Sequence, residues 1–368
     1  MIASRYLFAA LLATASLTAC IDPGDETLGE TADDLSTSSW WGGGSALNNL
    51  GNVPAMAMLN GAEYYVYPWD DGSAVLPGVS HDLYWHKCDS TGCTSPKRIP
   101  GQLSLGRVNL AAYNGFIYMV HQGDSDSTEV WFTRLTPSTG QWTSNVKLSF
   151  ATVVGAPALA AFNNRLYMVG SRKQQVIRNN VSVTTFPLWY ASMDTNEVWS
   201  PTGTLWGEES ASPPSLAVFA GQLYAAHRWG QTSQIVVQTL PAGGTWSAVQ
   251  HIFAGVNNAN IEGDDVQIAA VNGWLHLVHH RWSGSQTWWT YFNQCNPWAP
   301  EVTVPSYNFS SRSSMATSRQ GLSLYGLYDS GLWPYTDNNW RQINFNAPPP
   351  PIILPNCGIG IGGLGNDF

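Results

Sequence analysis

A two-residue turn that returns six times at nearly regular spacing constrains the fold of this chain more than any other feature. Most of these turns combine Asn with Gly or Asn, which tolerate the positive φ angles of tight hairpins. The turns are Asn60-Gly61, Asn114-Gly115, Asn163-Asn164, Ala220-Gly221, Asn272-Gly273 and Gln320-Gly321. Their second residues lie 54, 49, 57, 52 and 48 residues apart. A period of about 40 to 50 residues is typical of propeller blades.

Each repeat contains several short strand-like runs rather than one helical pattern. In residues 157–205, four apolar or alternating runs are separated by turn residues, which indicates an antiparallel meander. The sequence therefore predicts an all-β fold, a six-bladed β-propeller of four-stranded antiparallel blades. A seventh blade is the alternative, because Trp40-Trp41 followed by Ser45-Ala46-Leu47 resembles another outer strand. We favour a role for that segment in closing the ring beside the last blade, where it would leave no open sheet edge.

Residue size varies systematically within the repeat. The first strand is rich in small residues, as in Pro157-Ala158-Leu159-Ala160, which suits innermost strands that crowd a central axis. Large rings recur in the third and last strands and account for many of the 18 tryptophans. Those opening the last strand are Trp142, Trp199, Trp246, Trp298 and Trp340. Because one position carries the same ring in successive repeats, we expect these rings to fill the space between blades.

The first nineteen residues have the composition of a secretory leader. Arg5 precedes an apolar stretch from Leu7 to Leu17, and small residues follow. This stretch is too short for an ordinary membrane-spanning helix. The ending Leu17-Thr18-Ala19-Cys20 resembles the bacterial lipobox, and the segment is similar to a lipoprotein signal peptide. The resemblance implies cleavage before Cys20, a lipid on its sulfur, and residence in the bacterial envelope, at the outer membrane or cell surface.

Residues 20–36 form the next segment, which carries six acidic and no basic residues. With few large apolar residues it is predicted to be a disordered tether. The whole chain has a formal charge of −9, and subtracting the tether's −6 and the +1 of Arg5 leaves −4 for the rest. A body so close to neutral argues against nucleic acid as a partner. The lipid anchor is the only membrane contact we expect, and we expect a monomer.

The propeller is expected to span residues 37–346, followed by a Pro- and Gly-rich tail at 347–368. Cys88 and Cys93 flank a predicted hairpin turn, so a local disulfide is expected in an oxidising compartment. Cys295 and Cys357 would then form a second bridge that ties the tail to the fifth repeat. The cysteine and histidine spacing contains no zinc pattern.

Candidate ligand-binding residues follow the second strand of each repeat, on the face that also carries the loops between blades. His121, His227 and His279 recur at one position, and we expect them to be mainly structural. The residues around them vary, and Trp and Arg side chains there suit sugars through ring stacking and paired hydrogen bonds. The predicted ligand-binding set is Trp69, Arg172, His227, Arg228, Trp229, His280, Arg281, Trp282 and Asp329.

The full repeat resembles propeller repeats of secreted bacterial proteins. It reads Ala-Leu-Ala-x-Phe-Asn-x-x-Leu-Tyr, followed by a His-Arg end, then Leu-Trp-Tyr and finally Trp-Ser. Its layout is similar to that of sialidase-type and fucose-lectin-type propellers. The turn Asp194-Thr195-Asn196-Glu197 before Trp199 looks like a degenerate Asp box, a structural motif of sialidases. Arg98-Ile99-Pro100 is misplaced for that family's Arg-Ile-Pro, and no arginine triad with a Tyr-Glu pair is present. The resemblance implies a propeller fold. The residues that sialidase catalysis needs are not matched in this sequence.

Non-catalytic glycan binding is the leading functional hypothesis, with carbohydrate or polysaccharide as the partner. A glycoside hydrolase or lyase is the first alternative, since such enzymes need two facing carboxylates. Its candidates are the loop acids Glu208, Glu209, Glu262, Asp264 and Asp265. A surface for protein–protein interaction is the second alternative. No cofactor is expected, and the alternative is a calcium ion bound by the loop acids.

Overall fold

The structure is a computed structural model of the chain. It describes residues 54–69, 81–104, 107–123, 127–178, 180–210, 212–230, 232, 234–254, 259–260, 264–280, 286–293, 298–319, 321–328 and 340–345. Every regular element within these ranges is a β-strand, so they hold no helix that could cross a membrane. The leader, the tether, Trp40-Trp41, Cys20, and the bridge between Cys295 and Cys357 all lie outside the described residues.

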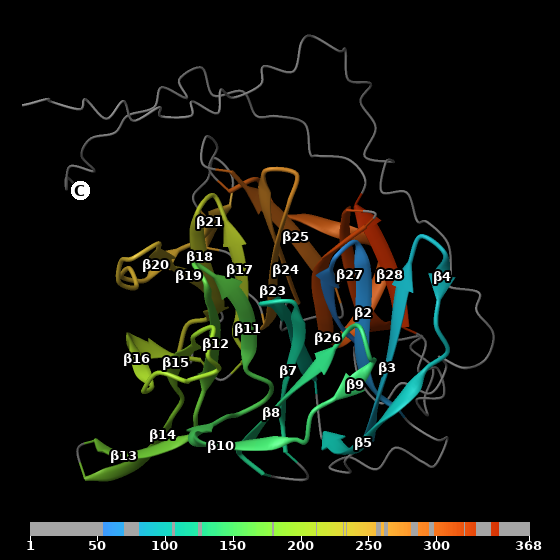
Figure 1. Cartoon of the computed structure of the whole chain (residues 1–368). Helices are drawn as coiled ribbons and strands as arrows, with labels where there is room; N and C mark the ends of the chain where they lie inside the picture. Colours follow the sequence, from blue (N-terminus) through green and yellow to red (C-terminus); the bar gives the residue numbers. More distant parts are fainter. Residues whose placement is uncertain are drawn as a thin grey trace, which may run out of the picture. The chain divides into compact units, whose positions relative to one another are not determined.

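Five extended antiparallel sheets make up the body (Figure 1). The first contains β1 (Ala55–Leu59), β2 (Ala62–Trp69), β3 (His81–Asp89), β4 (Gly92–Cys93) and β5 (Lys97–Ser104). The second contains β6 (Val108–Tyr113), β7 (Phe116–Gln122), β8 (Glu129–Thr136), β9 (Gln141–Trp142) and β10 (Val146–Thr152). In both sheets one short strand and one longer strand pair with the same third strand.

The third and fourth sheets have four strands each, in the order of the chain. The third contains β11 (Ala158–Phe162), β12 (Arg165–Ser171), β15 (Pro187–Met193) and β16 (Gly203–Glu209). The fourth contains β17 (Ser215–Phe219), β18 (Gln222–Arg228), β19 (Ile235–Pro241) and β20 (Gln250–His251). Two separate hairpins join β13 (Gln174–Arg178) to β14 (Val181–Thr185) and β21 (Phe253–Ala254) to β22 (Ala259–Asn260).

The fifth sheet is longer and corrects the predicted count of six or seven separate sheets. It contains β23 (Asp264–Val271), β24 (Trp274–His280), β25 (Gln286–Phe292), β26 (Val302–Ser318), β27 (Gly321–Tyr328) and β28 (Trp340–Phe345). The reason is β26, one continuous strand whose first part pairs with β25 and whose second part pairs with β27. The fifth and sixth repeats therefore share one hydrogen-bonded sheet, and the described residues form five extended sheets.

The repeated turns have the predicted conformation. Both residues have positive φ in the first five turns, as at Ala220 (48°) and Gly221 (75°). Such turns match the twist of the two strands that they connect. The sixth turn is displaced by one residue from the prediction: Ser318 pairs with Gly321, so Arg319 and Gln320 connect the strands. Gln320 itself lies outside the described residues.

Six inner strands surround the central hollow, and each contacts the next around the ring: β1, β6, β11, β17, β23 and β26. The register given by the turns places one residue of each strand at a common level. Three residues before each turn, all six positions are alanine: Ala57, Ala111, Ala160, Ala217, Ala269 and Ala316. No larger side chain occurs at this level, where the six strands converge, which explains the small residues that we predicted there.

Aromatic rings pack between neighbouring sheets, as the repeat predicted. Trp142 of the second sheet meets Trp85 of the first, with ring centroids 6.3 Å apart. Trp199 of the third repeat lies 5.2 Å from Phe132 of the second, and Trp246 of the fourth repeat lies 5.9 Å from Tyr190 of the third. All three pairs are edge-on, a favoured geometry of aromatic side chains. These tryptophans are therefore part of the scaffold.

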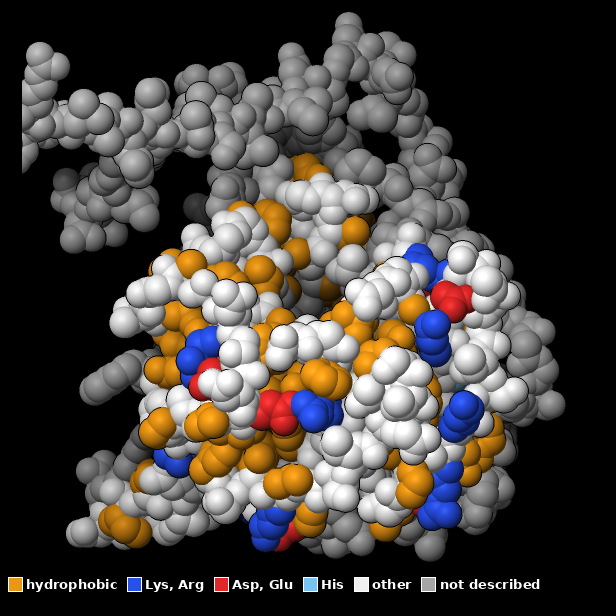
Figure 2. Space-filling model, in the orientation of Figure 1, with side chains coloured by type: hydrophobic (Ala, Val, Ile, Leu, Met, Phe, Trp, Pro, Cys, Tyr) orange, Lys and Arg blue, Asp and Glu red, His pale blue; other side chains and the backbone are white. Residues whose placement is uncertain are grey.

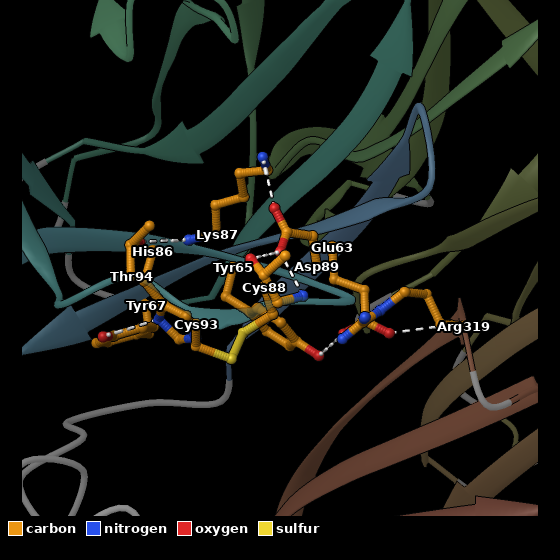
Figure 3. Close-up of a disulfide and its surroundings, with 11 residues drawn as sticks. Glu63, Tyr65, Tyr67, His86, Lys87, Cys88, Asp89, Cys93, Thr94 and Arg319 are labelled. Atoms are coloured by element: carbon orange, nitrogen blue, oxygen red, sulfur yellow. Dashed lines mark hydrogen bonds and ion pairs between the residues drawn. A yellow bond between two sulfur atoms is a disulfide. The ribbon is translucent and has the colours of Figure 1, made fainter.

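The first and last repeats are joined by Glu63, a buried residue on β2 (Figure 3). Its carboxylate accepts a hydrogen bond of 2.9 Å from the backbone N–H of Arg319 and one of 3.1 Å from the Tyr65 hydroxyl. The Arg319 guanidinium lies 3.4 Å from the same carboxylate. A buried carboxylate is stable only when it is well hydrogen-bonded, so this contact fixes how the ring closes.

The predicted local disulfide is present between Cys88 and Cys93 (Figure 3). The two residues face each other across the pairing of β3 with β4. Asp89 begins the intervening turn, and its carboxylate accepts a hydrogen bond of 2.9 Å from the Thr91 N–H. Lys87 lies 2.9 Å from the same carboxylate. The bridge thus fastens the short outer strand β4 to the first sheet.

Ala220 is the one alanine that occupies the first turn position, where four other turns have Asn. A side chain larger than glycine is unfavourable at φ near +50° by about 1 to 2 kcal/mol, and Asn partly escapes this cost. We expect Ala220→Asn to raise the free energy of unfolding by about 1 kcal/mol, measured by urea denaturation. The matched control Asn163→Ala should lower it by a similar amount. A neutral or destabilising Ala220→Asn would contradict this account of the turn.

Candidate functional site

The strand directions define two sides of the ring. We call the end where the six tight turns lie the turn side, and the opposite end the loop side. The second strands of the first five repeats end on the loop side, at Trp69, Gln122, Ser171, Arg228 and His280. The inner strands begin there, so the predicted candidate residues do share one side of the molecule.

The recurrent histidines on this side are structural. His121 is 1 % exposed, and its Nδ1 donates to the Gln122 carbonyl at 2.9 Å while its Nε2 lies 3.2 Å from the Asn145 amide nitrogen. His279 is fully buried, with Nε2 2.5 Å from the Glu301 carboxylate. Both partners occur three residues after a recurrent tryptophan of the same repeat, Trp142 or Trp298. The rings therefore brace their own repeat.

His227 occupies the same position and was also predicted to bind a ligand. Its side chain is fully buried, and its Nδ1 lies 3.2 Å from the Arg228 carbonyl. That burial leaves no surface for a ligand, which corrects the prediction for this residue. Desolvation lowers the pKa of His227 to about 4, because the charged imidazolium is disfavoured in a buried site. Burial has the same effect on His86, His121 and His276, each with a pKa of about 4.

Trp229 lies at the best-defined predicted position on the loop side. It directly follows β18, and its N–H donates to the Gln234 carbonyl at 2.8 Å. Its half-buried indole meets the His251 ring edge-on, with centroids 4.8 Å apart. The next residue, Gly230, donates its N–H to the Glu209 carbonyl at 2.6 Å and thereby links this loop to the end of the third sheet. Two backbone contacts and one ring contact thus hold the indole in place.

The other predicted residues are distributed around the ring. Trp69 is half-buried against Tyr84, with ring centroids 5.0 Å apart. Arg172 is half-buried after β12, and its backbone N–H donates a 3.1 Å hydrogen bond to the Pro187 carbonyl. Arg228 is largely buried at the end of β18. Trp69, Arg172 and Arg228 thus belong to three different sheets, while Arg281, Trp282 and Asp329 lie outside the described residues.

An ion pair between Arg107 and Asp265 is the main feature that the sequence did not reveal. Arg107 precedes β6 and Asp265 lies on β23, strands on opposite sides of the ring of six. Both side chains are more than nine-tenths buried, and Asp265 has a φ of +48°. His280, another predicted residue, has its Nε2 4.0 Å from the Asp265 carboxylate. No local pattern joins residues 158 positions apart, so only the folded ring shows this pair.

The pair lies at the loop-side end of the central hollow, which has a volume of about 300 Å³. Five residues before each turn, the inner strands contribute a second common level: Ala55, Asn109, Ala158, Ser215, Gln267 and Ser314. Four of these six are polar. The Asn109 amide donates to the Pro157 carbonyl at 2.8 Å, and Ser215 Oγ accepts the Ile268 N–H at 3.0 Å. The hollow is thus polar toward the loop side and lined by alanine further along.

The described loop acids do not form a facing pair of free carboxylates. Asp265 is engaged by Arg107, and the side chains of Glu208 and Asp264 lie outside the described part, as does Glu262. Among the residues whose placement is described, no group of three or more His, Cys, Asp or Glu side chains could hold a metal ion. Asp194 uses its carboxylate to accept the N–H groups of Asn196 (2.9 Å) and Val198 (3.0 Å). The sialidase-like turn is therefore a structural element here.

Charge is sparse on the face shown in Figure 2, where Lys, Arg, Asp and Glu side chains are separated by wider areas of polar and hydrophobic atoms. Several charged groups are paired, as Arg98 is with Asp82 at 2.7 Å. This agrees with the nearly neutral body expected from the sequence.

Comparisons with known proteins identify the fold. No protein-family model and no curated protein matches the chain. The solved structure of YjhT has 14 % identity and a TM-score of 0.52, over 82 % of this chain and 95 % of that one. Trypanosoma rangeli sialidase has 9 % identity and a TM-score of 0.52, over 81 % of this chain. This chain spans 54 % of that sialidase.

A third structure, a GH43_1 enzyme from Xanthomonas citri complexed with xylotriose, has 14 % identity and a TM-score of 0.43. It covers 63 % of this chain and 82 % of that one. At identities this low, the first two similarities establish an all-β propeller. They leave the activity to be argued from the site itself.

The buried histidines predict an acid-sensitive fold. With a native pKa of about 4 and an unfolded pKa near 6.5, His121 takes up a proton on unfolding between these pH values. Stability should therefore fall as the pH drops from about 6.5 to 4. We expect the free energy of unfolding of His121→Gln to fall less over this pH window than that of the unsubstituted chain. The difference between the two decreases should be on the order of 1 to 3 kcal/mol. Urea unfolding at pH 7 and pH 4.5, followed by tryptophan fluorescence, measures the difference. An unchanged pH dependence would contradict the buried neutral imidazole.

Proposed function

We propose that this chain is a non-catalytic glycan-binding protein whose loop side contacts carbohydrate. The observation that carries the proposal is the fixed, half-buried indole of Trp229 beside Arg228. An indole face packs on the apolar face of a pyranose ring, and a ring already held in place loses little entropy on binding. The edge-on contact with His251 orients this indole without stacking a second ring in parallel on it.

Two further properties support a carbohydrate ligand. Arg172 is half-buried on the same side, and its guanidinium can donate paired hydrogen bonds to hydroxyl or carboxylate oxygens. The scarcity of charge suits a mostly neutral partner, since a highly charged one requires an oppositely charged surface. One structural neighbour is a sialidase, which makes carbohydrate the first class of ligand to test.

The engagement of Asp265 by Arg107 favours binding over hydrolysis at the described loop acids. A retaining or inverting glycosidase needs two carboxylates that face one sugar. Here the best-placed acid is in an ion pair that crosses the ring. We therefore propose binding without turnover, at separate positions whose combined occupancy would add avidity for a polysaccharide.

A glycan array probed with the full chain tests this function. We expect binding to at least one glycan class, a loss of tenfold or more in Trp229→Ala, and a smaller loss in Arg172→Ala. Trp274→Ala is the matched control, because Trp274 is also a half-buried tryptophan but lies on the turn side, at the start of β24 and next to a tight turn. Measurement with and without EDTA also tests calcium dependence.

A folded chain that binds no glycan on the array would overturn the proposal. So would binding that survives Trp229→Ala and is lost in Trp274→Ala. Turnover of a bound glycan would instead favour the hydrolase alternative.

We also propose that the chain is anchored to the bacterial envelope through lipid on Cys20, as its lipobox-like sequence suggests. Multiple acyl chains would hold the protein stably at a membrane. Expressed in a bacterium, the full chain should enter the detergent phase in a Triton X-114 partition, and Cys20→Ala should stay in the aqueous phase. Equal partition of both forms would exclude the lipid anchor.

A further inference from the structure

The central hollow contains buried hydrogen-bond donors for which the scaffold provides no acceptor. Gln267 lines the hollow and is 6 % exposed, yet its amide nitrogen has no hydrogen-bond partner. Nε of Arg107, at the loop-side end, is also buried without a partner. Leaving such a donor without an acceptor costs about 1 to 3 kcal/mol, so an acceptor on a bound molecule would stabilise it.

The two levels of the hollow give it an amphipathic wall. The polar level, with Asn109, Ser215, Gln267 and Ser314, can bond to hydroxyl groups. Five of the six alanines, all except Ala57, line the adjacent level and offer an apolar surface. A volume of about 300 Å³ is at the lower end of the range of small-molecule pockets, which suits a single small ring and not a chain.

The charge of the hollow favours a neutral ligand. The Arg107 guanidinium is already neutralised by one oxygen of the Asp265 carboxylate, and His280 Nε2 lies 4.0 Å from the other oxygen. An anionic ligand that approached Arg107 would also approach Asp265, and the repulsion would be strong in a buried site. The remaining donors are therefore suited to uncharged oxygens.

Access is better from the turn side. Val218 lines the hollow near the turns and is 39 % exposed, and Thr317 at the same level is exposed too. At the other end, Ser215, Gln267 and Ser314 are buried and the Arg107–Asp265 pair crosses between opposite strands. The predicted ligand residues are all on the loop side, so this is a separate position.

We propose that the central hollow binds one neutral sugar ring that enters from the turn side. Gln267 and Arg107 donate hydrogen bonds to its hydroxyl oxygens, and the alanine level packs against its apolar face. The choice of a sugar over other neutral polyols rests on the proposed glycan-binding function. The site itself is distinct from the Trp229 position.

Saturation-transfer NMR and calorimetry with the full chain test the proposal. The probes are methyl glycosides of glucose, galactose, mannose and N-acetylglucosamine, with methyl glucuronide as the anionic comparison. We expect at least one neutral glycoside to bind at least tenfold more tightly than the glucuronide. Gln267→Leu removes the amide nitrogen that has no partner and should weaken that binding tenfold or more, with thermal melting as the check that the variant is folded.

Val218→Phe should block entry and weaken binding by a similar factor. Val198→Phe is its matched control, because Val198 is 60 % exposed in a turn remote from the hollow. If no neutral glycoside binds to the folded chain, the hollow holds only water and the proposal is overturned. Binding that survives both Gln267→Leu and Val218→Phe would overturn it as well.

The two proposals can fail separately. If array binding is lost in Trp229→Ala while no methyl glycoside binds, the loop-side function stands and the hollow site is wrong. A methyl glycoside that depends on Gln267 but not on Trp229 supports the hollow site. If the chain binds neither array glycans nor methyl glycosides, both proposals are wrong.

Discussion

The convergence of six inner strands on one axis is the constraint on which the rest of this structure depends. At the level of Ala57 and its five equivalents, a larger side chain in any repeat would push its strand away from the axis. The strands can then lie side by side, and large rings fill the wider space further out. Size therefore increases with distance from the axis, from alanine to tryptophan, in successive repeats. The sheets pack on each other through this gradient, as Trp142 against Trp85 illustrates.

Polar groups specify the details that packing alone leaves undetermined. Small side chains of one inner strand bond to the backbone of the next, as Asn109 does with Pro157 and Thr317 with Ala270. His121 and His279 brace the strands of single sheets from within. Glu63 then connects the first sheet to the turn at Arg319. The partners of these groups are fixed in position by the fold, so a shift in register would break the hydrogen bonds and leave more buried polar atoms unpaired.

Local sequence was sufficient to predict much of this fold, because its signals are short-range. The Asn-Gly turns, the small inner strands, the interblade tryptophans and the bridge between Cys88 and Cys93 all depend on residues close together in the chain. The sheet count was wrong because continuity of β26 is a property of its pairing and not of its composition. The displaced sixth turn had the same origin: Gly321 looked like a turn residue, but the register places it in β27.

The candidate site was less accessible from the sequence. Trp229 could be found because it follows a recurrent histidine, and its burial beside His251 agrees with an ordered ring. His227 was misjudged because periodicity cannot tell whether the end of a strand faces solvent. The Arg107–Asp265 ion pair and the burial of the Gln267 amide without a partner result from how distant strands come together in the fold. The spacing of residues along the sequence does not predict them.

Ring closure by Glu63 and Arg319 has a consequence for the chain's connectivity. Since β1 contacts β26 directly, the first and last inner strands are neighbours in space, like every other consecutive pair in the ring. Which repeat comes first in the chain is therefore not itself a requirement of the packing. A circularly permuted chain, opened at another loop-side connection and joined near the present boundary, would contain the same interfaces between sheets. The fold thus has a cyclic character that its linear sequence conceals.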